Sequence, residues 1–154
     1  MSEEDNNDPI FRYVFTVPES ALDENRHVNN VVYVQWMQDV ATLHFQSRVG
    51  EKAMQATGPT WFARSHQIEY LKPAFAGDSV VALTWPASYR RVRCFRHYQF
   101  LRASDNELLA QGETDWVYVD GITGKPKRIP NDITSRIPSV DVKDKADFHT
   151  TSKT

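Results

Sequence analysis

Apolar residues recur at steps of three and four between positions 31 and 49 of the chain. Such spacing places them on one face of a helix. The stripe consists of Tyr33, Trp36, Met37, Val40, Ala41 and His44. Gly50 follows as a stop signal, and Asn29 or Asn30 is suited to cap the first turn. We therefore expect one long helix over about Val31 to Val49.

The remaining chain alternates apolar and polar residues, which predicts strands. These strands are expected over Phe11 to Val17, Trp61 to Tyr70, Ser79 to Tyr89, Arg93 to Ala103 and Leu108 to Val119. The alternation is interrupted around Arg64 to His66, so this segment is either one bent strand or two short ones. The pattern predicts an α+β fold in which a curved antiparallel sheet of about five to six strands wraps a long helix.

Length and charge narrow the class of protein. A chain of 154 residues fits one domain. We expect residues 1–9 to be a disordered leader, 10–137 the folded domain and 138–154 a disordered, charged tail. A formal net charge of −2 gives no support for a nucleic-acid or membrane-surface partner. The single cysteine, the lack of a signal peptide and the lack of a spanning apolar run favour a cytoplasmic location.

A polar run, Asp23-Glu24-Asn25-Arg26-His27-Val28-Asn29-Asn30, leads directly into the expected helix. Asp23, Asn25 and His27 supply a carboxylate, a carboxamide and an imidazole at alternating positions, which suits attack on a carbonyl carbon. The N–H of Asn30 would point toward the acyl oxygen, where the positive end of the helix dipole stabilises developing negative charge. From spacing alone, the same residues are also typical of a solvated turn.

A metal site is disfavoured at the same place. Val28 and Val34 occupy positions at which a calcium-binding EF-hand loop needs Gly and Glu. No second His or Cys has zinc-ligand spacing with His27. Cys94 is expected to be a packed side chain rather than a nucleophile. No nucleophile elbow is present, so serine-hydrolase chemistry is disfavoured.

The run from Asp23 to Tyr33 resembles the D-x-N-x-H-V-N-N-x-x-Y motif of hot-dog-fold acyl thioesterases. The likeness is to the plant-type acyl-ACP thioesterases and, more loosely, to the 4-hydroxybenzoyl-CoA thioesterase group. It implies a hot-dog fold, a catalytic carboxylate at Asp23 and catalytic roles at Asn25 and His27. Two departures are Ala21, where many relatives carry a second Asp, and Arg26, where Gly or Gln is common.

Two further places are candidates for function. Glu69 faces opposite to its strand neighbours, so it is either solvated or directed into a cleft. The resemblance implies a catalytic Glu there. Arg90, Arg91 and Arg93 lie at the junction of two expected strands and form either a phosphate clamp or a solvated basic turn. The resemblance implies that this region holds the CoA phosphates.

These observations predict a thioesterase that converts an acyl-CoA, or an acyl-ACP, to a free acid and a thiol. Asp23 would attack the carbonyl or activate a water, and Glu69 would assist as a base. CoA is part of the substrate, and no cofactor or metal is expected. Trp61 and Phe62 are candidates for lining an acyl pocket. An uncovered sheet edge predicts self-association, and the resemblance implies a homodimer or homotetramer. The alternatives are a non-catalytic acyl-CoA-binding protein and, less favoured, a hot-dog hydratase or dehydratase.

Overall fold

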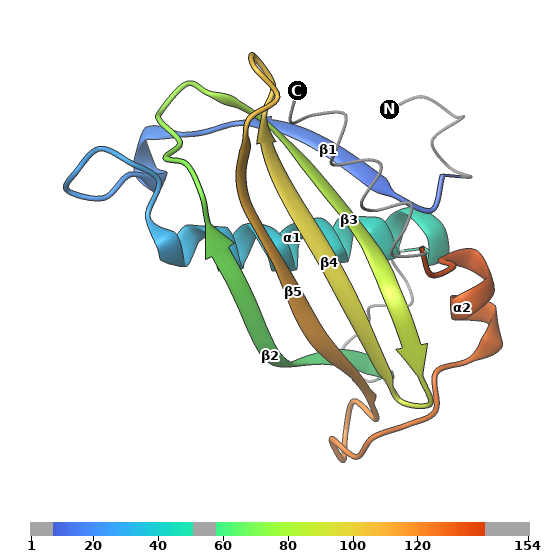
Figure 1. Cartoon of the computed structure of the whole chain (residues 1–154). Coiled ribbons are helices and arrows are strands. Elements are labelled where there is room, and N and C mark those ends of the chain that lie inside the picture. Colours follow the sequence, from blue (N-terminus) through green and yellow to red (C-terminus); the bar gives the residue numbers. More distant parts are fainter. Residues whose placement is uncertain (1–7, 51–57, 141–154) are drawn as a thin grey trace.

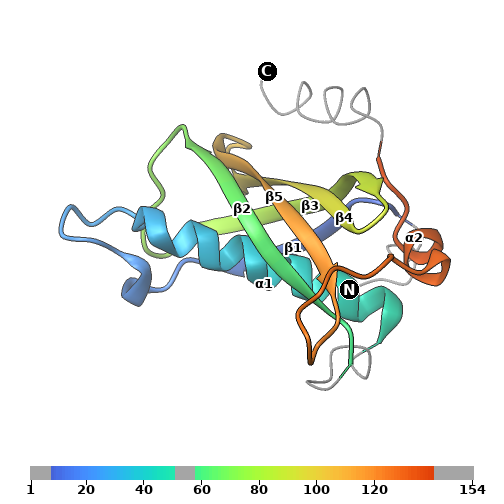
Figure 2. The ribbon, with the colours of Figure 1, turned by 90° about the horizontal axis from the view of Figure 1, so that it is seen from below.

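The computed structural model describes residues 8–50 and 58–140, and it consists of one sheet, one long helix and two short helical segments. The elements are β1 (Phe11–Thr16), η2 (Glu19–Ala21), α1 (Asn30–Val49), β2 (Thr60–Tyr70), β3 (Ser79–Arg90), β4 (Arg93–Arg102), β5 (Leu108–Val119) and α2 (Asn131–Arg136). The five strands are antiparallel in the order β1-β3-β4-β5-β2. The sheet curves around α1, which runs across one of its faces (Figures 1 and 2). The predicted α+β architecture is confirmed.

Helix α1 begins and ends as its sequence indicates. The side-chain oxygen of Asn29 accepts the N–H of Val31 at 3.0 Å, so Asn29 rather than Asn30 is the N-cap. Gly50 closes the helix with φ 98°, a left-handed conformation that glycine adopts without strain. The buried face consists of Tyr33, Met37, Val40, Ala41, His44 and Phe45. Trp36 of the predicted stripe is only half-buried.

Strand β2 is one bent strand rather than two. Its pairing with β5 slips between Ala63 and Ser65, which is the signature of a β-bulge. The bulge explains why alternation fails around Arg64 in the sequence. Beyond it, Ile68 packs into the core under α1. The strand therefore presents alternating residues to the helix as far as Tyr70.

Packed structure continues past the predicted domain boundary at Ile137. Val140 is buried against β3, and its N–H donates to the carbonyl oxygen of Pro86 at 2.8 Å. A lone apolar residue in a polar segment gives little sign in the sequence that it packs. Residues 51–57 lie outside the described residues, as do most of the expected leader and the tail from 141 onward. Among the described helices, none is long and apolar enough to cross a membrane.

Candidate active site

The polar run before α1 folds into a tight hairpin. Leu22 and Val28 form an antiparallel bridge, and the N–H of Asp23 donates to the carbonyl oxygen of His27 at 2.8 Å. The N–H of Arg26 returns to the carbonyl oxygen of Asp23 at 3.0 Å. Arg26 has φ 65°, a conformation that glycine adopts more readily. In Figure 1 this hairpin, in blue, projects beyond the sheet at the N-terminal end of α1.

The three candidate side chains of the hairpin are all exposed in the single chain. Oδ1 of Asp23 accepts the N–H groups of Asn25 and His27, at 2.9 and 3.3 Å. The imidazole of His27 packs edge-on against Phe75, with ring centroids 5.2 Å apart. The carboxylate of Asp23 therefore shapes the turn through one oxygen. Within the described residues its second oxygen, Oδ2, has no hydrogen-bond partner.

The hairpin is joined to the rest of the domain at the start of α1. The N–H of Val28 donates to Ala74, and that of Asn29 donates to Ala21, each at 2.9 Å. The cap uses the N–H of Val31. In the part of the chain that the structure describes, the N–H of Asn30 has no acceptor. It is therefore a donor available to a ligand at the positive end of the helix dipole.

A cavity of about 200 Å³ lies beside this helix terminus. It is lined by Val28, Asn30, Tyr33, Tyr70, Leu71, Lys72, Pro73 and Ala74. The hydroxyl of Tyr70 donates to the carbonyl oxygen of Asn30 at 2.9 Å, which ties β2 to the helix start. The hydroxyl of Tyr33 is buried and has no partner among the described residues, and burial raises its pKa to about 12. Tyr33 therefore lines the cavity as an uncharged side chain.

Exposed apolar side chains surround the same terminus. Val31 is 73% exposed in the first turn of α1. Tyr70 and Leu71, at the end of β2, and Phe75, against His27, are also exposed. A cluster of this kind beside a cavity is typical of a surface that binds an apolar ligand or a partner.

Glu69 lies on the opposite face of the sheet from the cavity. Its neighbours Ile68 and Tyr70 face α1, whereas its carboxylate accepts the side-chain N–H of Gln111 at 2.7 Å on the outer surface. The sequence predicted this alternation. Glu69 is exposed in the single chain, and together with Gln111 it also lines a cavity of about 270 Å³ on this outer face. One protomer does not bring Glu69 to the hairpin.

The arginine cluster lies at the other end of the molecule. Arg90 and Arg93 are opposite each other where β3 turns into β4, and Figures 1 and 2 both place this turn far from the blue hairpin. Arg93 forms a two-point ion pair with Asp115 and lies over the ring of Phe95. Arg90 and Arg91 are exposed. One protomer therefore separates the predicted catalytic and phosphate-binding residues.

Sequence reasoning overlooked two members of the site. Tyr70 and Lys72 line the cavity beside Asn30, although neither belongs to the polar run. The available signal was the alternation of β2, which puts Tyr70 on the helix side. Cys94 is buried, and burial raises the pKa of its thiol to about 11, which agrees with a packing role. Trp61 lines a different pocket and Phe62 is 61% exposed.

Comparisons with known proteins agree on the family and the fold. The family described as the thioesterase-like superfamily matches residues 17–137. No curated protein sequence matches the chain. Among solved structures, the hypothetical protein SAV2348 from Staphylococcus aureus in complex with CoA is 19% identical, with a TM-score of 0.76. That alignment covers 83% of this chain and 81% of the other.

Two further structures carry more specific names. A 1,4-dihydroxy-2-naphthoyl-CoA thioesterase from Synechocystis is 18% identical, with a TM-score of 0.74, over 83% of this chain and 95% of the other. A 12:0-ACP thioesterase from Umbellularia californica is also 18% identical, with a TM-score of 0.74, over 86% of this chain and 51% of the other. At such identities these likenesses establish the fold.

Proposed function

The chain belongs to the thioesterase-like superfamily, and from this membership we propose that it hydrolyses the thioester bond of an acyl-CoA to a free acid and CoA. The observation that carries the proposal is the start of α1, where Asn30, whose N–H has no acceptor among the described residues, lines a cavity of about 200 Å³. The similar structure solved with CoA and the one named as a naphthoyl-CoA thioesterase support a CoA ester as substrate.

The helix terminus would act on the carbonyl oxygen. As the carbonyl carbon becomes tetrahedral, negative charge develops on this oxygen, and the N–H of Asn30 donates to it. A positioned donor of this kind contributes about 3 kcal/mol to the transition state. The aligned peptide dipoles of α1 add to the effect. The Asn29 cap leaves this donor free because it takes the N–H of Val31 instead.

Asp23 would either activate a water for attack or supply the attacking oxygen itself. Its Oδ2 either accepts a proton from a water that attacks the carbonyl carbon or attacks that carbon itself. In the first route the water oxygen bonds to carbon, the carbon–sulfur bond breaks and the thiolate leaves. In the second route Oδ2 bonds to carbon, the carbon–sulfur bond breaks and the thiolate leaves, and a water then hydrolyses the acyl–carboxylate intermediate to the free acid and the Asp23 carboxylate. Asn25 and His27, on the same hairpin, would orient the water or the carbonyl.

A second copy of the chain would complete the site. Asp23 is exposed in the single chain, while Glu69 and the arginine turn lie on other surfaces. In a homodimer, or in a homotetramer built from two dimers, a partner can bring its own copies of these residues to the hairpin. Glu69 would then assist as a base, and Arg90, Arg91 and Arg93 would hold the CoA phosphates. The exposed apolar side chains around Val31 support burial against such a partner.

Thiol release from a panel of aliphatic and aromatic acyl-CoAs tests the proposal. We expect turnover by the wild type and a loss of about 10²- to 10⁴-fold in kcat/KM for Asp23→Asn, which removes the carboxylate and keeps its size. Glu24→Gln is the matched control, because it removes the adjacent exposed carboxylate. Undiminished turnover in Asp23→Asn would refute the assigned role. Wild-type binding of acyl-CoA without thiol release would favour a non-catalytic binding protein.

A further inference from the structure

A buried cation lies under the C-terminal half of α1. Arg96 of β4 is only 5% exposed. Its Nη1 donates to Nδ1 of His44 at 2.9 Å and to Oγ1 of Thr84 at 3.2 Å. Burial, helped by the charge of Arg96, lowers the pKa of His44 to about 2, so the imidazole is a neutral acceptor. No carboxylate of the described residues is bonded to this guanidinium.

A buried guanidinium normally has an anionic partner, because removing an unpaired charge from water is costly. Both hydrogen bonds of Arg96 leave from Nη1. In the described part of the chain, its Nε and Nη2 donors therefore have no partner. The protein therefore buries a positive charge whose Nε and Nη2 donors remain available to a ligand.

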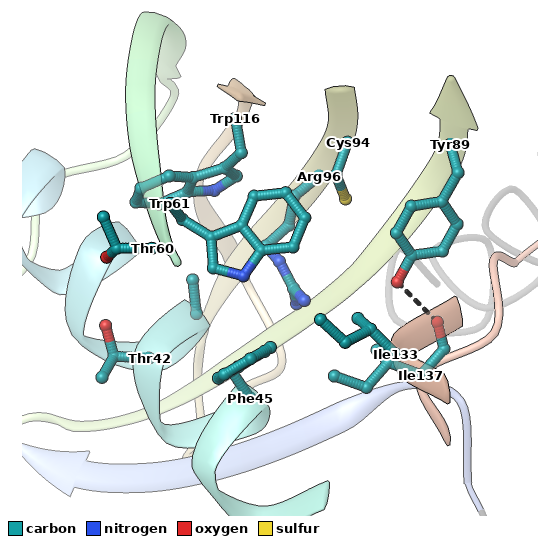
Figure 3. A pocket seen from close by; sticks show the side chains of 11 residues that line it. Thr42, Phe45, Thr60, Trp61, Tyr89, Cys94, Arg96, Trp116, Ile133 and Ile137 are labelled. Carbon is teal, nitrogen blue, oxygen red and sulfur yellow. Dashed lines mark hydrogen bonds between the residues drawn. The ribbon is translucent and has the colours of Figure 1, made fainter. Parts of the chain in front are cut away.

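The unused donors border a pocket. A cavity of about 80 Å³ is lined by Arg96, by residues of α1 and α2, and by aromatic rings of the sheet. This is several times the volume of about 10–15 Å³ that a single water needs. Figure 3 shows the guanidinium of Arg96 projecting between Trp61 and Ile133, with Phe45 below. Within the described residues the indole N–H of Trp61 also has no acceptor.

We propose that this pocket binds a small apolar carboxylate, aromatic or short-chain aliphatic, whose oxygens accept from the free guanidinium donors of Arg96. A planar guanidinium matches a carboxylate in charge and in geometry. The rings of Phe45, Trp61 and Trp116 would enclose the apolar part of the ligand. A phosphate is disfavoured because it needs more donors than these walls provide.

The pocket is separate from the cavity at the start of α1. The two sets of lining residues share no member. Thr42, which lines the Arg96 pocket, follows Asn30 by roughly 18 Å of helix at about 1.5 Å per residue. A carboxylate in this pocket therefore does not occupy the position proposed for the thioester. Binding here is expected to be unchanged in Asp23→Asn, so this proposal and the proposed hydrolase activity can fail independently.

Titration with benzoate, followed by nuclear magnetic resonance of the tryptophan indole N–H groups, tests the proposal. We expect saturable shifts of the Trp61 and Trp116 signals, assigned by Trp→Phe variants. Benzamide is the neutral analogue of the same shape, and we expect it to bind at least about tenfold more weakly. Equal affinity for benzoate and benzamide would overturn the proposal. So would the absence of saturable shifts up to about 10 mM benzoate.

Two variants test the charge of Arg96 and the volume of the pocket separately. Arg96→Met should weaken benzoate binding at least about tenfold, whereas Arg12→Met, which removes an exposed arginine on β1, should leave it unchanged. Thr42→Met fills the pocket from a half-buried helix position and should also abolish binding. Thr42→Met still tests whether benzoate binds in this pocket if Arg96→Met does not fold. Wild-type affinity in folded Thr42→Met would place benzoate elsewhere and refute the pocket.

Discussion

At the scale of single residues, the polar run before α1 serves as a turn as well as a candidate site. Oδ1 of Asp23 fixes the hairpin by accepting two backbone N–H groups, and this leaves Oδ2 for chemistry. The turn reading therefore describes this side chain, and its catalytic role stays a prediction. Arg26 follows at φ 65°, at the position where the resemblance leads one to expect Gly or Gln. Its side chain adds only an ion pair with Glu19, in which both groups are about three-quarters exposed.

Arg26→Gly should stabilise the protein by about 1 kcal/mol. A side chain at positive φ costs roughly 1–2 kcal/mol, which glycine avoids, although glycine also gains conformational freedom in the unfolded chain. The lost ion pair with Glu19 offsets little, because exposed pairs contribute about 0–1 kcal/mol. Urea denaturation measures the change as a higher midpoint at an unchanged slope.

Arg26→Ala is the matched control for this prediction. It removes the ion pair and keeps a β-carbon at positive φ, so its free energy of unfolding should lie within about 0.5 kcal/mol of the wild type. A gain in Arg26→Ala equal to that in Arg26→Gly would show that backbone strain at this position is not the cause. A loss of stability in Arg26→Gly would contradict the prediction directly.

At the scale of elements, Met37 of α1 packs closely over Gly112 of β5. A β-carbon at this position would lie 2.7 Å from the carbonyl oxygen of Gln67 and 3.3 Å from Cε and Sδ of Met37. The first contact is with the backbone of the neighbouring strand, which cannot move aside as a side chain can. The absence of a side chain at Gly112 therefore allows both the pairing of β5 with β2 and the packing of α1 on the sheet.

Gly112→Ala should destabilise the protein by about 1–3 kcal/mol, the usual cost of overpacking a well-packed interior. Thermal and urea unfolding measure this loss. Gly121→Ala is the control, because Gly121 lies in the exposed turn after β5 and is not among the positive-φ residues. It should change stability by less than about 0.5 kcal/mol. If Gly112→Ala were as stable as the wild type, the close approach of β5 to β2 and α1 would be wrong.

The sequence predicted the elements well because their periodicity is local. The helix was expected over about Val31 to Val49 and runs over Asn30–Val49, and each strand was found close to its expected bounds. The hot-dog resemblance added the way these elements are assembled. The hairpin was also predictable as a turn, since Asx residues favour one. What it does chemically stays a prediction, because the single chain leaves Asp23 exposed.

The two pockets could not be predicted, because each depends on pairing between segments distant in sequence. Arg96 borders its pocket because β4 pairs with β3 in a register that brings it to Thr84, and because α1 adds His44. Alternation did place Arg96 on the same face as the buried Tyr98. That signal existed, but the nearby exposed arginines suggested a solvated basic turn. Tyr70 lines the other cavity because β2 ends beside the start of α1, where its hydroxyl donates to the carbonyl oxygen of Asn30.

At the scale of the whole molecule, the single sheet ends in two open edges, β1 and β2. An unpaired edge presents backbone donors and acceptors that can pair with another chain. β2 is the longer edge, with 11 residues against 6 for β1. It carries the exposed Phe62 and ends at Tyr70 beside the helix terminus. Pairing along β2 would therefore bring a second copy to the candidate site.

Phe62→Lys should convert the proposed dimer to a monomer. Its side chain is 61% exposed on the free edge, so the substitution costs little within one chain. In a dimer paired along this edge, the two introduced ammonium groups would repel each other and would lose contact with water. Light scattering during size-exclusion chromatography should show the wild type at twice the chain mass of 17.7 kDa or a higher multiple. The dimer dissociation constant of the variant should be at least about tenfold higher than that of the wild type.

Tyr13→Lys is the control on the opposite edge, since Tyr13 is 42% exposed on β1. It should leave the β2 dimer intact. If the proposed site needs residues from two copies, thiol release by Phe62→Lys should fall as its dimer dissociates on dilution, while dimeric Tyr13→Lys shows no such concentration dependence. Monomeric wild type would refute the β2 dimer. A dimer that persists in Phe62→Lys but dissociates in Tyr13→Lys would move the interface to β1, away from the helix terminus, and the hairpin would then have to act without a second copy beside it.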